Sequence, residues 1–203
     1  MPAEQRRWVW IGVDLGQRRD YTAIAVVERV WEQAVAGEFL RSGVDGQWWF
    51  RVRLLERVRL GTPYPEIVKR VKEIVRHPLI AMGRTVVVDG TGVGAPVVDL
   101  LRQAGLGCGI NPVIITGGGR SGLLAGGYVS VPRAELLTAV QLLVQQGRLR
   151  VAARCKEAET LRRELLGLKL AGGDSGVHDD LALAVALAVW KARAGVRVVE
   201  ERR

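Results

Sequence analysis

The chain has 203 residues, the length of one domain, and its 48% apolar and 25% charged residues are ordinary values for a globular protein. This composition excludes wholesale disorder, and no apolar run reaches the roughly 18 residues that a bilayer crossing needs. The first ten residues lack the apolar region of a signal peptide, so we expect a cytoplasmic protein. The two cysteines, Cys108 and Cys155, predict neither a disulfide framework nor a zinc site. We expect a single domain over residues 1–203, with its core at about 8–194.

The charge of the chain is its most informative bulk property. Thirty basic and twenty-one acidic residues give a net charge of +9 and a pI near 10.4. Twenty-five of the basic residues are arginines, and a basic tail covers residues 191–203. Such a balance favours an anionic partner, above all nucleic acid, because arginine binds phosphate through two parallel hydrogen bonds. A GC-rich genome would enrich arginine as well, and the two explanations are compatible.

The first third of the sequence predicts three strands. Residues 8–15 (WVWIGVDL) and 21–28 (YTAIAVVE) are apolar runs joined by a polar turn, which is typical of a hairpin. Residues 47–60 alternate between apolar and charged side chains and predict a long third strand with one buried face.

Strands and helices alternate in the rest of the chain. Residues 85–89 (TVVVD) and 110–116 (INPVIIT) have the pattern of buried parallel strands, and residues 117–127 read as a glycine-rich loop. Helical spacing, proline starts and glycine or proline stops predict helices at 63–78, from 94 through 101, from 132 to 147, at 156–166 and at 179–194. A three-stranded antiparallel meander followed by parallel strands and flanking helices predicts an α/β domain with the RNase H-like fold.

Four carboxylates fall at the ends of these predicted elements. Asp14 and Asp89 each end a buried strand, and Asp179 and Asp180 open the last helix. If the two strands are parallel neighbours, their aspartates lie at the same edge of the sheet, where the last helix could bring Asp179 or Asp180. Clustered carboxylates repel one another unless a cation lies among them, and oxygen ligands of this kind suit Mg²⁺ or Mn²⁺. Two such ions are the usual apparatus for cleaving a phosphodiester.

Each carboxylate also has a purely structural interpretation. Asp14 and Asp89 precede glycines in turn-like sequences, while Asp179 fits the N-cap and Asp180 the first turn of a helix. Taken singly, these interpretations are the stronger ones. Their joint placement on the predicted topology favours a metal site.

Five motifs follow one another along the chain: VWIGVDLGQRRDYTAIAVVE, TVVVDGTGVGAPVVDLL, SVPRAELLTAVQLLVQQGRLRV, ETLRRELLGLKL and GVHDDLALAVALAVW. In order and spacing they resemble the nuclease domain of phage terminase large subunits. The resemblance covers residues 8–190. It implies a metal-dependent endonuclease acting on double-stranded DNA, with Asp14, Asp89 and one or both of Asp179 and Asp180 holding two Mg²⁺ or Mn²⁺ ions. Asp20 and His178 are possible accessory residues.

The sequence departs from complete large subunits in two respects. No G-x-x-x-x-G-K-[ST] motif is present, so this chain by itself is not a packaging motor. We therefore expect a phage or prophage protein that acts in a bacterial host, with a separate packaging ATPase or other packaging proteins as possible partners. Family members often have a lysine in the loop after the fifth strand, where Arg120 is the only charge here and a possible DNA contact.

Three other functions remain open from sequence. A Holliday-junction resolvase shares the fold and the acidic cluster but acts as a dimer on four-way DNA. The IGVDLG run also resembles the phosphate-binding hairpin of actin-like and sugar-kinase ATPases, which normally need two lobes and a longer chain. The third is a DNA-binding module with an inactive site.

Overall fold

The computed structural model describes residues 8–16, 20–33, 46–80, 83–92, 94–168 and 179–200. The strands within these residues form one eight-stranded mixed sheet in the order β6-β7-β5-β4-β1-β2-β3-β8. The strands are β1 (Trp8–Asp14), β2 (Thr22–Gln33), β3 (Gly46–Val58), β4 (Arg84–Asp89), β5 (Gly109–Thr116), β6 (Gly122–Leu123), β7 (Val129–Pro132) and β8 (Leu149–Val151).

The sheet has an antiparallel part and a parallel part. β1, β2 and β3 pair antiparallel in sequence order and form the predicted meander. β4 lies parallel on the other side of β1, and β5 and β7 continue the parallel part. The predicted RNase H-like α/β fold is therefore confirmed. Because β1 and β4 are parallel neighbours, their carboxyl ends lie at the same edge.

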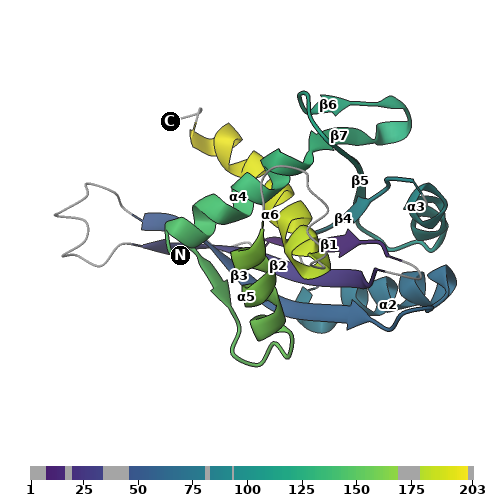
Figure 1. Cartoon of the computed structure of the whole chain (residues 1–203), viewed down its shortest axis with the longest axis horizontal. Coiled ribbons are helices and arrows are strands. Elements are labelled where there is room, and N and C mark those ends of the chain that lie inside the picture. Colours follow the sequence, from purple (N-terminus) through teal and green to yellow (C-terminus); the bar gives the residue numbers. More distant parts are fainter. Residues whose placement is uncertain are drawn as a thin grey trace, which may run out of the picture.

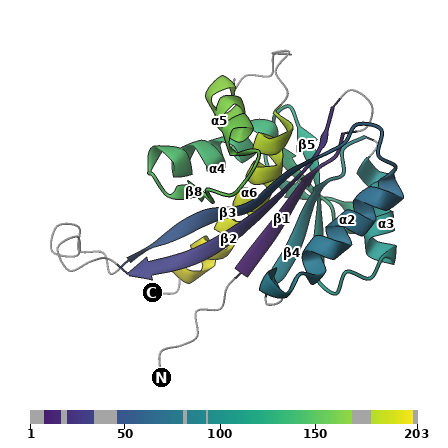
Figure 2. The same ribbon diagram turned by 90° about the horizontal axis from the view of Figure 1, so that it is seen from below.

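Helices cover both faces of the sheet (Figures 1 and 2). One face carries α2 and α3, and the other carries α6, on which α4 and α5 pack. The helices are α2 (Tyr64–Arg76), α3 (Gly94–Gln103), α4 (Arg133–Gln145), α5 (Ala158–Gly167) and α6 (Asp180–Glu200), with short 3₁₀ turns η1 (Pro78–Ile80) and η2 (Ala125–Gly127). No helix among the described residues is long and apolar enough to cross a membrane.

Alternation along β1 divides the core between the two faces. Val9, Ile11 and Val13 join the cluster under α2 and α3, whereas Trp10 joins the cluster under α6. Successive side chains of a strand point to opposite faces, so a strand covered on both sides reads as an unbroken apolar run. Asp14 follows Val13 and therefore lies on the α6 face.

Close packing brings α6 onto β1. A Cβ atom added to Gly12 would lie 1.8 Å from the carbonyl oxygen of Ala184, so only glycine permits this approach. The helix meets Gly12 at Ala184 and Ala188, both of which are fully buried. These small side chains let the backbone of α6 lie against the sheet, with the start of the helix near the end of β1.

Some elements differ from the sequence prediction. The segment predicted as a loop, residues 117–127, contains β6 and η2, and β7 and β8 were not predicted. β6 and β8 are two and three residues long and exist through pairing with β7 and β3, which no local pattern reveals. The helix predicted at 179–194 extends to Glu200, so much of the basic stretch at 191–203 is helical. Pro132 is the N-cap of α4 instead of its first residue.

Candidate metal centre

Asp14 and Asp89 lie side by side at the carboxyl edge of the sheet. Val13 of β1 is opposite Val88 of β4, and each aspartate is the next residue and the last of its strand. Asp14 is buried, with 8% of its surface exposed, and Asp89 is half-buried. The parallel register thus brings together two acidic groups that are 75 residues apart in the sequence.

The electrostatic environment of Asp14 includes other carboxylates. Burial raises the pKa of Asp14 well above its ordinary value, and the negative charges of Asp89, Asp180 and Asp20 raise it further. Arg133 acts in the opposite direction. Four carboxylates therefore share one field, and ionised Asp14 is stabilised only when positive charge lies near it.

Thr91 orients the carboxylate of Asp89. The backbone N–H and the hydroxyl of Thr91 both donate to Oδ1 of Asp89, at 2.8 and 2.5 Å. The same hydroxyl oxygen accepts the backbone N–H of Ile115 on β5, at 2.9 Å. Burial raises the pKa of Asp89, and the two bonds from Thr91 lower it. Its other oxygen, Oδ2, takes no part in these bonds with Thr91.

Asp179 and Asp180 have different environments. Asp180 is the first residue of α6, is buried, and acts on the pKa of Asp14. Asp179 occupies the expected N-cap position, because its backbone oxygen accepts the N–H of Leu183 at 2.9 Å. Its side chain forms an ion pair with Arg133, the first residue of α4. The charge of Asp180 therefore acts on Asp14, whereas the side chain of Asp179 is paired with a cation.

Three residues near this edge were not predicted from the sequence: Arg57, Arg133 and Glu164. Arg57 on β3 forms an ion pair with Glu164 on α5, which is only 3% exposed. Burial raises the pKa of Glu164, while the N–H of Ala182 and Arg57 lower it and Asp180 raises it. One signal was present in the sequence, because Glu164 interrupts the apolar stripe formed by Leu161, Leu165 and Leu168.

The remaining predicted residues have mixed outcomes. Asp20 is exposed, yet its charge acts on Asp14. Arg120 is exposed in the segment that follows β5, at the edge that carries the aspartates. His178 lies outside the described residues.

The donors at this edge suit a divalent cation in kind. Carboxylate oxygens from β1, β4 and α6 are the hard ligands that Mg²⁺ and Mn²⁺ take, and their mutual repulsion at Asp14 is what a cation would relieve. Over the described ranges, no three His, Cys, Asp or Glu side chains are already closed around a common metal position. The chemistry of the donors fits a metal, whereas the carboxylates are not gathered around one point.

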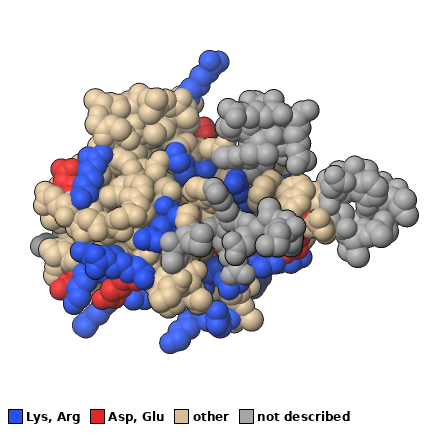
Figure 3. Space-filling view, turned by 180° about the vertical axis from the view of Figure 1, so that it is seen from behind, with Lys and Arg blue, Asp and Glu red and all other residues tan. Residues whose placement is uncertain are grey.

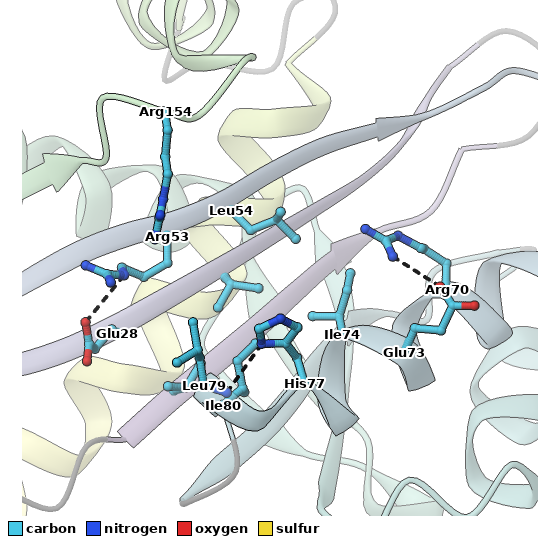
Figure 4. A pocket seen from close by; sticks show the side chains of 12 residues that line it. Glu28, Arg53, Leu54, Arg70, Glu73, Ile74, His77, Leu79, Ile80 and Arg154 are labelled. Carbon is cyan, nitrogen blue, oxygen red and sulfur yellow. Dashed lines mark hydrogen bonds and ion pairs between the residues drawn. The ribbon is translucent and has the colours of Figure 1, made fainter.

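A hollow of about 360 Å³ lies on the other face, between the strands and α2 (Figure 4). Its floor is apolar, with Leu54 and Ile74 in its middle, and Arg53 and Arg70 stand at opposite ends beside acidic partners. None of the edge aspartates lines it.

Lys and Arg outnumber Asp and Glu on the face seen from behind (Figure 3).

Comparison with solved structures places the fold in a class. The chain has the fold of terminase nuclease domains, a class of RNase H-like structures. The crystal structure of the large terminase nuclease from the thermophilic phage G20c is 21% identical, with a TM-score of 0.55, over 90% of this chain and 81% of the other. The terminase nuclease domain of human cytomegalovirus, soaked in Mn, is 15% identical, with a TM-score of 0.57, over 94% and 86%.

A second structure of the cytomegalovirus domain has a TM-score of 0.52 at 15% identity. No family model matches the sequence, and a search of the curated proteins found no match. At these identities the similarity shows the fold.

Proposed function

We propose that the protein is a divalent-metal-dependent DNA endonuclease of the terminase type. The observation that carries this proposal is the placement of Asp14 and Asp89 side by side at one edge of the sheet, where the charge of Asp180 from α6 also acts on Asp14. The fold supports it, because the similar solved structures are terminase nuclease domains and one of them was soaked in Mn. The same similarity favours a nuclease over the kinase-type ATPase that the IGVDLG run also suggested.

The three carboxylates have distinct roles in this proposal. Asp14 and Asp180 are the buried ligands, from β1 and α6, and Asp89, oriented by Thr91 through Oδ1, offers its other oxygen from β4. Two Mg²⁺ or Mn²⁺ ions bound here would supply an activated water and stabilise the leaving oxygen of the phosphodiester. The side chain of Asp179 is paired with Arg133, whereas the charge of Asp180 acts on Asp14, so we infer that Asp180 is the main ligand of the two.

The anionic partner in the proposal is double-stranded DNA, cut with little sequence preference. The net charge of +9 supports phosphate binding, and exposed Arg120, in the segment that follows β5, is the proposed contact with the DNA backbone. A separate packaging ATPase or other phage packaging proteins would be its protein partners.

Cleavage of a supercoiled plasmid tests the proposal. We expect nicking and linearisation with Mn²⁺ or Mg²⁺, none with EDTA, and loss of cleavage in Asp14→Asn with DNA binding retained. Asp99→Asn is the matched control, because Asp99 is an exposed aspartate on α3. Cleavage that continues in chelator, or full activity of Asp14→Asn, would refute the metal mechanism.

The same assay separates the two aspartates at α6. We expect Asp180→Asn to abolish cleavage, because Asp180 is the buried carboxylate that acts on Asp14. Asp179→Asn should lower the rate by a smaller factor, since the side chain of Asp179 is paired with Arg133. The reverse order would show that Asp179 is the ligand.

A further inference from the structure

A row across three strands leads from Asp14 to Arg57. Asp14 on β1 is opposite Ala23 on β2, and Ala23 is opposite Arg57 on β3. Directly opposite residues project from the same face of a sheet, so all three side chains lie on the α6 face. Ala23 belongs to the core cluster that contains Leu181 and Ala182, the second and third residues of α6. The small side chain of Ala23 leaves room for the start of this helix between Asp14 and Arg57.

Arg57 contacts two carboxylates at the far end of the row. Its Nη2 atom pairs with Oε1 of Glu164 and lies 3.8 Å from Oδ2 of Asp180. The guanidinium also stacks 5.1 Å from the ring centroid of Tyr21, which precedes β2. The arginine is thus held by a ring and an acid while it faces the candidate ligand Asp180.

Glu164 connects this arginine to the backbone of α6. While Oε1 pairs with Arg57, Oε2 accepts the backbone N–H of Ala182 at 2.8 Å. The first N–H groups of a helix have no partner within the helix, and a carboxylate there also interacts well with the helix dipole. Glu164 therefore fixes the first turn of α6, and with it the backbone that carries Asp180.

We propose that Arg57 and Glu164 are positioning residues that hold Asp180 in place for a divalent cation. This inference rests on the proposed metal-dependent function. A buried ion pair is a weak source of stability, because the loss of hydration offsets the attraction between the charges. The effect of this pair is geometric: Arg57 lies beside the side chain of Asp180, and Glu164 binds the first turn of the helix that carries Asp180. Groups that orient metal ligands typically change metal affinity about 10- to 100-fold when removed.

The sign of the effect separates positioning from simple electrostatics. Arg57 is a positive charge beside an acidic site, so by Coulomb attraction alone its removal strengthens cation binding. If Arg57 positions Asp180, its removal weakens cation binding despite that gain. The two roles thus predict opposite changes in the dissociation constant.

The experiment measures the affinity of the purified protein for Mn²⁺ alone by calorimetry, without DNA. We expect Arg57→Met to bind Mn²⁺ about 10- to 100-fold more weakly than the wild type. Arg57→Lys should recover part of the affinity, because it keeps the charge but not the planar fork of donors. Arg53→Met is the matched control: it removes an arginine of the same strand that is paired with Glu28 and lines the hollow on the other face. We expect wild-type affinity in this control.

A second variant is needed in case Arg57→Met does not fold, because this substitution leaves Glu164 buried without its cation. The double variant Arg57→Met/Glu164→Gln removes one positive and one negative charge and keeps an acceptor for the N–H of Ala182. Electrostatics predicts unchanged Mn²⁺ affinity for it, and positioning by Arg57 predicts a loss. Wild-type or tighter Mn²⁺ binding in the folded variants would overturn the positioning role of Arg57 and Glu164 without affecting the proposed function. A wild-type protein that neither binds Mn²⁺ nor cleaves DNA would overturn the proposed function and this inference together.

Discussion

At the scale of single residues, Asp14 occupies the least favourable place for a charge in the described part of the site. It is buried, and three other carboxylates act on it. A group that serves only as a turn former gains nothing from such an environment, because asparagine supports a turn equally well. The unfavourable field is understandable if the charge is compensated by a bound cation in the working protein.

This environment predicts how stability depends on pH. The pKa of Asp14 is raised in the folded state, so in metal-free protein its contribution to stability is complete below the ordinary pKa of an aspartate and is lost as the pH rises through the raised value. The amide side chain introduced by Asp14→Asn does not ionise. We therefore expect this variant to melt at a higher temperature than the wild type at neutral pH, by a few degrees, and at the same temperature near pH 3.

Thermal unfolding in EDTA across this pH range measures the effect. A shift of about 2–4 °C corresponds to 1 kcal/mol in a domain of this size. Addition of Mn²⁺ should raise the Tm of the wild type more than that of the variant, because the ligand stabilises the state that binds it. Equal melting temperatures of the wild type and Asp14→Asn at neutral pH would contradict the electrostatically unfavourable environment of Asp14.

At the scale of elements, the position of α6 depends on the glycine beneath it. Helical spacing predicted a final helix at 179–194, but not the element against which it packs. The structure shows that the neighbour is β1 and that contact occurs at Gly12. The same contact brings Asp180 toward Asp14, so packing and site geometry are coupled.

Gly12→Ala tests this coupling. The new Cβ would lie 1.8 Å from the carbonyl oxygen of Ala184, so α6 must move or the strand must bend. Overpacking of this kind costs about 1–3 kcal/mol or more, and we expect that loss in urea unfolding. Cleavage should fall by more than the loss of folded protein accounts for, because Asp180 moves with α6. Gly117→Ala, in open space, is the control, and equal stability of the two variants would disprove the close contact.

At the scale of the whole molecule, the net charge of +9 is partly masked, because many arginines already pair with carboxylates. Paired arginines contribute less to phosphate binding than exposed ones without an acidic neighbour. Arg120 is exposed and follows β5, so it is the single residue with which we test a contact with the DNA backbone.

The salt dependence of DNA binding measures such contacts. We expect log K for duplex DNA to fall linearly with log salt, by about 0.9 for each phosphate contact. Arg120→Ala should reduce the slope by about one contact and leave the Tm unchanged, because the side chain is exposed. Arg162→Ala, which removes an exposed arginine of α5 paired with Glu159, should leave the slope unaltered. An unchanged slope in Arg120→Ala would place the DNA elsewhere.

The local sequence pattern was sufficient to predict the strands and helices whose own apolar side chains form a buried face. The unbroken apolar runs of β1 and β4 and the helical stripes of α2 and α4 are strong signals, because period and burial are properties of the chain itself. The order of these elements identified the fold, and aspartates at the ends of two strands predicted a common edge. β6 and β8 escaped prediction because strands of two or three residues exist only through their partners.

The sequence alone thus determined the fold class and the four aspartates worth testing, since both follow from the spacing of neighbouring residues. The tertiary structure decided that the charge of Asp180 acts on Asp14, that Asp179 pairs with Arg133, and that Arg57 lies beside Asp180. Arg133 pairs with Asp179 across 46 residues, and Arg57 pairs with Glu164 across 107. Such contacts depend on where separate elements meet in space. Glu164 gave a local signal, because it interrupts the apolar stripe of α5, whereas the arginines are locally compatible with ordinary exposed surface. Only the packing of α4, α5 and α6 on the sheet could reveal their partners.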